Sequence, residues 1–281
     1  MSVARNGECE LHYDTFGDAA HPTLLLVNGL GSQCINYAGE WCELFAGHGL
    51  HVVRFDNRDV GLSSRFADAP VDEHGAAYHL SDMAADAFAV LDAVGVEAAH
   101  VMGLSMGGMI VQTMAIERPE RVLTVTSVMS HSGEREYAVS SPRAFELLTA
   151  PPAADREEYV QNTIRGLHEW GSPEFADEGR WRAQAEASWD RAAPTDGGTR
   201  RQFLAVGSSG HRADGLRALR TPMLVLHGDR DTLIDQIGGR RTAELVPGAR
   251  FELIEGMGHD YPPQLWPRWT QLVVDHIRSH S

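Results

Sequence analysis

The chain has 281 residues, and its 39 acidic and 24 basic residues give a formal net charge of −15 at neutral pH. This charge has the wrong sign for a protein that binds nucleic acid or an anionic membrane surface, so both are excluded as partners. All 24 basic residues are arginine, which excludes lysine chemistry such as Schiff-base formation or a P-loop phosphate site.

The first part of the chain predicts the strands and helices of an α/β domain. A hairpin is expected over residues 7–17, where side chains alternate in polarity and Asn6-Gly7 favours a tight turn. The apolar runs 23–29 and 51–56 have strand length, and strands that are apolar on both faces lie inside parallel sheets covered by helices. The next elements are a helix over 81–95 with Ser81 as its N-cap and Gly95 at its end, a strand over 99–105, a helix over 106–117 and a strand over 121–130.

The pattern changes between residues 131 and 220. This segment is polar, rich in helix-forming residues and interrupted by Pro and Gly clusters, and it contains no strand-like apolar run. The alternation then resumes with a strand over 221–229, a helix over 235–246, a strand over 249–256 and a helix over 263–279. The sequence therefore predicts a doubly wound α/β core made of residues 1–130 and 221–281, with a mainly helical cap inserted at 131–220.

Cysteine usage and hydropathy bear on the compartment. Cys9, Cys34 and Cys42 are odd in number and form no CxxC pair, so neither a disulfide framework nor a zinc site is predicted. The chain starts without a signal-peptide pattern, and no apolar run approaches the roughly 18 residues of a membrane span. These features predict a cytoplasmic protein and leave open whether it is a monomer or a homo-oligomer.

One serine lies between two glycines at a predicted strand-to-helix junction. The run Gly103-Leu104-Ser105-Met106-Gly107 has the form G-x-S-x-G of a nucleophile elbow, in which a strained turn raises the serine hydroxyl above the sheet edge. Side chains two positions away on either side would clash in such a turn, and the glycines avoid this. Ser105 is therefore the predicted nucleophile; the structural alternative is a serine that only caps the helix.

A serine hydroxyl needs a base near neutral pH, and a histidine is the expected partner. Of the 14 histidines, His259 has the most diagnostic place, in a Gly-rich loop directly after a predicted strand. His227 and His131 each lie at or after the end of another strand, near the same sheet edge, and either is a candidate for lining a pocket.

An acid must orient the imidazole. Asp231 and Asp229 both follow the strand over 221–229, and Asp231 is preferred because the turn at Gly228 lets it point back toward the imidazole. The carboxylate that does not orient the imidazole is expected to stabilise a turn or a helix start. A third candidate is Glu134, because some related enzymes carry the acid after an earlier strand.

Two backbone amides are expected to stabilise the negative oxygen of a tetrahedral intermediate. One is the N–H of Met106, directly after the serine, and the other is the N–H of Leu30 in the Gly-rich loop 28–32. Residues predicted to contact the substrate are Gly29, Gly31, His131 and Met257.

These motifs together resemble the α/β-hydrolase fold family. In that family the catalytic residues follow one another along the chain in the order serine, acid, histidine, and the resemblance implies Ser105, Asp231 and His259 here. More narrowly, the runs 54–64, 100–108 and 256–262 resemble esterases of aromatic polyketide pathways of the aclacinomycin methylesterase type. Many members have His-Gly where this chain has Asn28-Gly29, which bears on the geometry of the loop. The polar residues of the first run, Asp56, Arg58 and Asp59, are predicted to form a buried ion-pair network.

The predicted activity is hydrolysis of a carboxylic ester through an acyl-enzyme, with no metal and no organic cofactor. The resemblance implies a small hydrophobic ester as substrate, such as the methyl ester of an aromatic or polyketide-like compound. Alternatives with the same three residues are a carbon–carbon bond hydrolase, a lactonase and a cofactor-free perhydrolase, and a non-enzymatic one is a ligand receptor. Aromatic residues of the cap are candidates either for a substrate-binding wall or for the core of the cap: Tyr159, Trp170, Phe175, Trp181 and Trp189.

Overall fold

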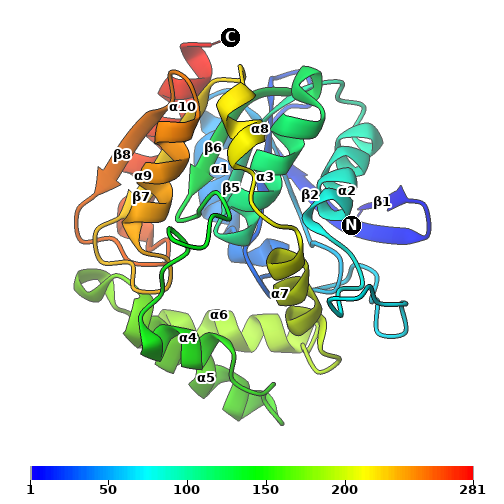
Figure 1. Cartoon of the computed structure of the whole chain (residues 1–281), viewed down its shortest axis with the longest axis vertical. Coiled ribbons are helices and arrows are strands. Elements are labelled where there is room, and N and C mark those ends of the chain that lie inside the picture. Colours follow the sequence, from blue (N-terminus) through cyan, green and yellow to red (C-terminus); the bar gives the residue numbers. More distant parts are fainter. Residues whose placement is uncertain (1, 281) are drawn as a thin grey trace.

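The computed structural model describes residues 2–280, and its centre is an eight-stranded sheet (Figure 1). The strand order is β1-β2-β4-β3-β5-β6-β7-β8, in which β1 and β2 are antiparallel to their neighbours and the other pairs are parallel. The strands are β1 (Ser2–Asn6), β2 (Cys9–Phe16), β3 (Thr23–Val27), β4 (His51–Phe55), β5 (Ala99–Leu104), β6 (Val122–Val128), β7 (Met223–Gly228) and β8 (Arg250–Ile254).

The strand predictions are confirmed. The hairpin closes through a two-residue turn, because Asn6 pairs with Cys9, and Gly7 has a φ of +58° that favours glycine. Strands β3 and β4 are buried along their whole length, as expected for strands covered on both faces.

Helices cover both faces of the sheet (Figure 1). On one face, α1 (Gly39–Gly47) and α10 (Trp266–Arg278) pack together over a cluster that includes Trp41 and Trp269. The helices over the other apolar cluster are α2 (Leu80–Ala93), α3 (Met106–Glu117), α8 (Ala213–Ala218) and α9 (Gln236–Leu245). The sheet is therefore sandwiched between two helical layers, as in a doubly wound fold.

The predicted start of α2 is wrong by two positions. The N-cap is His79 and not Ser81: the His79 amide donates to the carboxylate of Asp82 at 2.8 Å, and this reciprocal capping arrangement starts the helix earlier. Ser81 lies inside the first turn, where its hydroxyl donates to Glu117 instead. The predicted end is confirmed, since Gly95 directly follows the C-cap residue and has a φ of +76°.

Between β6 and β7 the chain forms helices and no strand among the described residues. Four of them, drawn at the lower end of Figure 1, are α4 (Pro142–Leu148), α5 (Arg156–Trp170), α6 (Glu178–Arg191) and α7 (Gly198–Ser208). Their shared apolar cluster is small and consists of Val160, Ile164, Trp181 and Ala185. Helix α8 falls inside the range 131–220 but packs on α3 and α9, with Gly215 pressed against Ile116.

Buried ion pairs involve the three charged residues predicted to form a network. Each of the three is buried and paired, but its partner comes from a distant element and not from the same run. Two of the partners lie on or at the end of the inserted helices. The pairs are Arg58–Asp86 (2.6 Å), Arg191–Asp56 (2.7 Å) and Arg201–Asp59 (2.7 Å).

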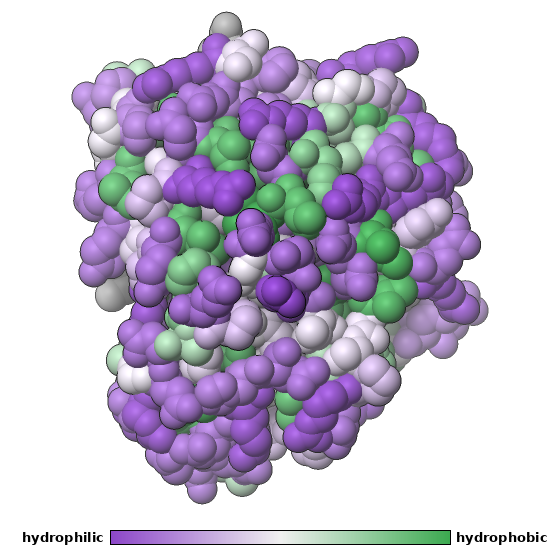
Figure 2. Space-filling model, turned by 90° about the vertical axis from the view of Figure 1, so that its left-hand side faces the viewer, coloured by the Kyte–Doolittle hydropathy of each residue, from purple (hydrophilic) through white to green (hydrophobic). Residues whose placement is uncertain are grey.

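The surface is mainly polar. On the face drawn in Figure 2, apolar side chains are scattered among hydrophilic ones and the lower, inserted part is predominantly hydrophilic. Within residues 2–280, no helix combines the length and the apolar character that a membrane crossing requires.

Candidate active site

The elbow at Ser105 has the strained geometry that its glycines predict. Ser105 joins β5 to α3 with a φ of +55°, a rare value for a residue with a side chain. A Cβ atom on Gly103 would lie 2.0 Å from the carbonyl oxygen of Gly107, and one on Gly107 would lie 2.1 Å from the carbonyl oxygen of Val27. Glycine is therefore required at both positions, and the turn presents the Ser105 hydroxyl at the end of the sheet.

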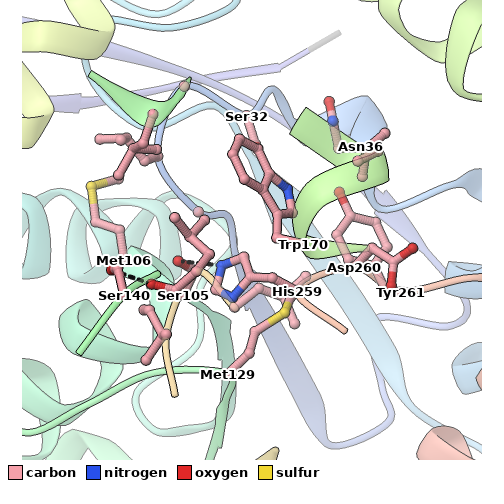
Figure 3. Close-up of a pocket in the computed structure, with 18 of the residues that line it drawn as sticks. Ser32, Asn36, Ser105, Met106, Met129, Ser140, Trp170, His259, Asp260 and Tyr261 are labelled. Atoms are coloured by element: carbon pink, nitrogen blue, oxygen red, sulfur yellow. Dashed lines mark hydrogen bonds between the residues drawn. The ribbon is translucent and has the colours of Figure 1, made fainter. Parts of the chain in front are cut away.

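The imidazole of His259 lies against this hydroxyl. His259 follows β8 in a loop, and its Nε2 is 2.9 Å from Ser105 Oγ (Figure 3). Its Nδ1 is 2.7 Å from Oδ2 of Asp231, which follows β7. A proton on Nδ1 that bonds the carboxylate leaves Nε2 free to accept from the serine hydroxyl. The structure thus brings together the three side chains predicted from the sequence.

Asp231 is held as a carboxylate by several donors. Its Oδ1 accepts hydrogen bonds from the amides of Leu233 and Ile234, at 3.0 Å and 2.8 Å. Burial alone would raise the pKa of Asp231, but the charge of His259 and hydrogen bonds from His227 and His259 lower that pKa to about 2. Asp231 is consequently ionised at neutral pH.

The other two candidate acids have different partners. Asp229 accepts a hydrogen bond from the amide of Gly256 at 2.7 Å and so stabilises the turn after β8, as expected for the carboxylate that does not orient the imidazole. Glu134 forms a bidentate ion pair with Arg241, at 2.9 Å and 3.0 Å. His227, buried at the end of β7, contacts the Asp231 carboxylate at 3.4 Å while bonding the carbonyl of Ile234 at 2.9 Å.

The loop after β3 passes directly beside the serine. A Cβ atom on Gly29 would lie 3.4 Å from the Cβ and 4.0 Å from the hydroxyl of Ser105, so the loop backbone is in contact with the elbow. Gly31 has a φ of +67°, and its amide donates to the side chain of Gln202 on α7 at 2.8 Å. Met106 is the first residue of α3, where helix amides have no partner within the helix. Leu30 and Met106 both line the cavity above Ser105.

Asn28 is buried directly after β3, at the start of this loop. Its carbonyl accepts from the side chain of Asn57 at 3.1 Å, whereas neither polar atom of its own side chain has a partner among residues 2–280. The loop backbone is held by the Asn57 contact and by Gln202.

A cavity of about 1340 Å³ lies between the sheet end and the inserted helices. This volume exceeds the usual range for small-molecule sites, so a large ligand fits. The predicted contact residues Gly29, Gly31 and His131 line it. The prediction for Met257 is wrong: this side chain is fully buried in the apolar cluster under α10 and does not reach the cavity, because the chain turns after β8 and packs Met257 against Gly228.

Aromatic residues of the inserted segment divide between the cavity and its support. Tyr159, Trp170, Phe175 and Trp181 line the cavity, and Trp181 also belongs to the small apolar cluster of the helices. Trp189 is absent from the lining and packs on Tyr159 with ring centroids 5.5 Å apart. Some of these aromatic residues therefore line the cavity, as expected for a substrate-binding wall, and others pack within the inserted segment, as expected for its core.

The inserted segment is bonded to the loop that carries His259. The amide of His259 donates to the carbonyl of Trp170, and the amide of Gly258 donates to the hydroxyl of Ser172 at 2.9 Å. Ser172 in turn donates its amide, at 3.0 Å, and its hydroxyl to the carboxylate of Asp260. Burial raises the pKa of Asp260, while the hydrogen bonds from Ser172 lower it. Figure 3 shows Trp170 and Asp260 beside His259.

Three polar residues at the site were missed in the sequence: Gln202, Ser172 and Asp260. Gln202 is fully buried, and besides the Gly31 amide it bonds the carbonyl of Arg58 at 2.8 Å. Their partners are distant in sequence, so only Asp260, adjacent to His259, carried any local signal.

The chain matches known proteins over nearly its whole length. A family model for the alpha/beta hydrolase fold matches residues 22–261. Rhodomycin D methylesterase of Streptomyces peucetius is 30% identical over 98% of this chain and 97% of its own. A putative carbamate hydrolase of Pseudomonas savastanoi pv. phaseolicola is 28% identical over 89% of this chain and 90% of its own.

Solved structures share the architecture. The enol-lactonase of Burkholderia xenovorans LB400 aligns with a TM-score of 0.79 at 22% identity, covering 99% of this chain and 100% of its own. A meta-cleavage product hydrolase of Pseudomonas fluorescens IP01 aligns with a TM-score of 0.81 at 17% identity, covering 100% and 98%. At these identities the alignments bear on the fold alone. The family match and the full-length relatives together establish that this chain belongs to the α/β-hydrolase fold family.

Proposed function

We propose that this chain is a serine hydrolase that cleaves a carboxylic ester through an acyl-enzyme, with Ser105 as nucleophile, His259 as base and Asp231 as the orienting acid. The observation that carries the proposal is the unbroken row from hydroxyl to imidazole to carboxylate, with distances of 2.9 Å and 2.7 Å. It is the arrangement that activates a serine near neutral pH.

The reaction proceeds in two halves. His259 takes the proton from Ser105 as its Oγ attacks the ester carbonyl, and the Asp231 carboxylate stabilises the imidazolium that forms. The amides of Leu30 and Met106 donate to the developing oxyanion, each contributing roughly 3 kcal/mol to transition-state stabilisation. His259 then protonates the departing alcohol and activates a water molecule, which releases the acid and restores Ser105.

The substrate we propose is a bulky hydrophobic ester, such as the methyl ester of an aromatic or polyketide-like compound. The cavity is large, and its lining includes six aromatic side chains of the inserted segment together with Met106, Met109 and Met129. Two full-length relatives, from Streptomyces peucetius and Streptomyces sp. (strain C5), are rhodomycin D methylesterases. Size, apolar lining and relatives all favour the same class of ester.

We further propose that residues 131–220 act as a cap over the cavity and that the protein works in the cytoplasm on a small-molecule substrate. Support for the cap comes from the position of α4 to α7 beside the cavity that they line. Support for a reducing compartment comes from Cys9, Cys34 and Cys42, all of which are free thiols.

The test is hydrolysis of a panel of aryl and methyl esters, lactones and ring-cleavage diketones. Replacing Ser105→Ala is expected to lower kcat about 10³-fold or more with every substrate that the wild type accepts. Ser208→Ala, on α7 outside the cavity, is the matched control and should stay within about 2-fold. Ester hydrolysis that persists in pure Ser105→Ala protein would refute the proposal. Slow labelling of Ser105 by a fluorophosphonate, together with negligible hydrolysis of every substrate, would favour a ligand receptor.

A further inference from the structure

The buried and partly buried arginines are almost all paired with carboxylates. Acidic residues outnumber basic ones 39 to 24, so acceptors are abundant. Among the described arginines that are not solvent-exposed, Arg180 and Arg212 have no carboxylate within 4.0 Å, whereas the others each form an ion pair; both unpaired residues line the large cavity.

Arg212 is the more deeply buried of the two. Only 9% of its surface is exposed. Its Nε donates to the side-chain oxygen of Gln112 on α3 at 3.0 Å, and its Nη2 donates to the carbonyl of His131 at 2.8 Å. Both acceptors are neutral. Burial lowers the pKa of Arg212 to about 10, so the guanidinium remains charged at neutral pH.

The remaining nitrogen of Arg212 has no protein acceptor. Within residues 2–280, no hydrogen bond joins Nη1 to the protein. Nη1 also differs from the unpartnered polar atoms that are completely buried, so it keeps some accessible surface. Arg212 lines the cavity, and we infer that the unused N–H groups of Nη1 are available to a ligand there. Burying a cation without a counter-charge costs free energy, and an anion that binds next to Arg212 in the cavity would offset this cost.

The neighbourhood of Arg212 is short of negative charge. His131 lies next to it, and burial together with the charge of Arg212 lowers the pKa of His131 to about 3, so this imidazole is neutral. The carboxylates that line the cavity are Asp177 and Asp260. Asp177 accepts from the amide of Arg180 at the start of α6, and Asp260 is bonded to Ser172.

We propose that Arg212 binds an anionic oxygen group of the substrate, so that the enzyme selects esters that carry a second, negatively charged group such as a carboxylate. The inference rests on the proposed ester hydrolysis at Ser105 and names the substrate class more narrowly. Arg180 is the weaker candidate because it is partly exposed and stacks on the ring of Trp266, with its guanidinium 4.8 Å from the centroid.

The experiment compares each monomethyl ester of the straight-chain dicarboxylic acids, from succinate through sebacate, with its dimethyl ester. In an apolar cavity without a cation, the half-ester would be the poorer substrate, because its carboxylate loses water. With Arg212 as partner, kcat/KM of the wild type is expected to favour the half-ester by about 10-fold or more at one or two chain lengths.

Variants locate the anion site. Arg212→Gln is expected to abolish the preference for the half-ester, measured as the ratio of kcat/KM for the half-ester to kcat/KM for the dimethyl ester in one preparation, while circular dichroism reports on correct folding. Arg220→Gln is the matched control, since this exposed arginine has no carboxylate partner in the described part of the chain and does not line the cavity. If Arg212→Gln does not fold, the wild-type comparison and Arg212→Lys, which keeps the charge and should keep part of the preference, still decide the question.

The outcomes separate the two proposals. A wild type that hydrolyses dimethyl esters and prefers them at every length overturns the role of Arg212 and leaves ester hydrolysis intact. A preference that survives Arg212→Gln, or one that only Arg180→Gln removes, also overturns the assignment. A wild type that hydrolyses no ester of any kind removes both proposals together.

Discussion

In the core, apolar side chains fill both faces of the eight-stranded sheet, whereas the inserted helices share an apolar cluster of four buried residues. Ala205 and Phe175 of the inserted segment contact the two core clusters, and polar contacts add to this attachment: the ion pairs of Arg191 and Arg201, the Gln202 hydrogen bonds and the contacts of Ser172. Apolar packing is not directional, while ion pairs and hydrogen bonds have defined partners. The core therefore positions Ser105, Asp231 and His259, and the polar contacts help to position the helices that line the cavity.

The largest expected effect comes from breaking the backbone packing of the core at the elbow. In Gly107→Ala the new Cβ would lie 2.1 Å and 2.7 Å from the carbonyl oxygens of Val27 and Asn28, which cannot move independently of the sheet. We expect a loss of more than about 4 kcal/mol in the free energy of unfolding, or no folded protein. Thermal and urea unfolding measure this.

The control for that substitution is Gly47→Ala at the end of α1, where an added Cβ has nothing within 4 Å. It should be neutral or stabilise the protein by up to about 1 kcal/mol. Two variants of equal stability would show that the elbow packs more loosely than these distances indicate.

A smaller effect is expected where an ion pair joins α7 to the core. Arg201→Gln leaves the fully buried carboxylate of Asp59 with Tyr78 and the Phe66 amide as its remaining donors. Removing one partner of a buried pair costs about 3 kcal/mol or more. The urea midpoint should fall accordingly, without a change in slope.

An exposed pair within the inserted helices gives the matching control. Arg156 bonds Asp190 at 2.8 Å on the surface, so Arg156→Gln should cost less than about 1 kcal/mol. If both arginine variants lose the same stability, the inserted segment is not held by its buried contacts with the core.

The smallest effect concerns a buried histidine of the core. Burial lowers the pKa of His100 on β5 from 6.5 to about 4. Between these values the unfolded chain binds a proton that the folded chain does not, so stability falls as the pH drops from about 6.5 to 4, by up to about 3 kcal/mol for this group. Urea unfolding at several pH values should show a shallower acid loss for His100→Gln than for the wild type.

His21→Gln serves as the reference in that series, because His21 is exposed and lies in a loop. It should retain the wild-type dependence on pH. Identical profiles for all three proteins would mean that folding does not lower the pKa of His100.

The sequence predicts the core closely because each buried strand is a continuous apolar run of strand length, as in β3 and β4. The side chains at the site were also predictable, since Ser105, Asp231 and His259 each follow a strand of the parallel part, and such strand ends share one edge of the sheet. Local sequence was enough wherever one strand and its following turn determined the position.

Local sequence was not enough where a distant partner decides the position. Met257 lies two residues before His259, yet packing against Gly228 turns it into the core. Gln202 bonds Gly31 across 171 positions, and Arg212 reaches Gln112 across 100. The start of α2 was missed for the same reason at short range, because the capping pair of His79 and Asp82 outweighs a serine that favours N-caps in general.

The central claim is that Ser105 becomes a nucleophile because His259 lies within hydrogen-bonding distance of it. The most direct measurement is incubation of the folded protein with a fluorophosphonate, followed by mass spectrometry of its peptides. The account predicts one adduct, on Ser105, which disappears when the protein is denatured beforehand or when His259 is replaced by alanine. An adduct on a different residue, or folded protein that remains unlabelled, would contradict it.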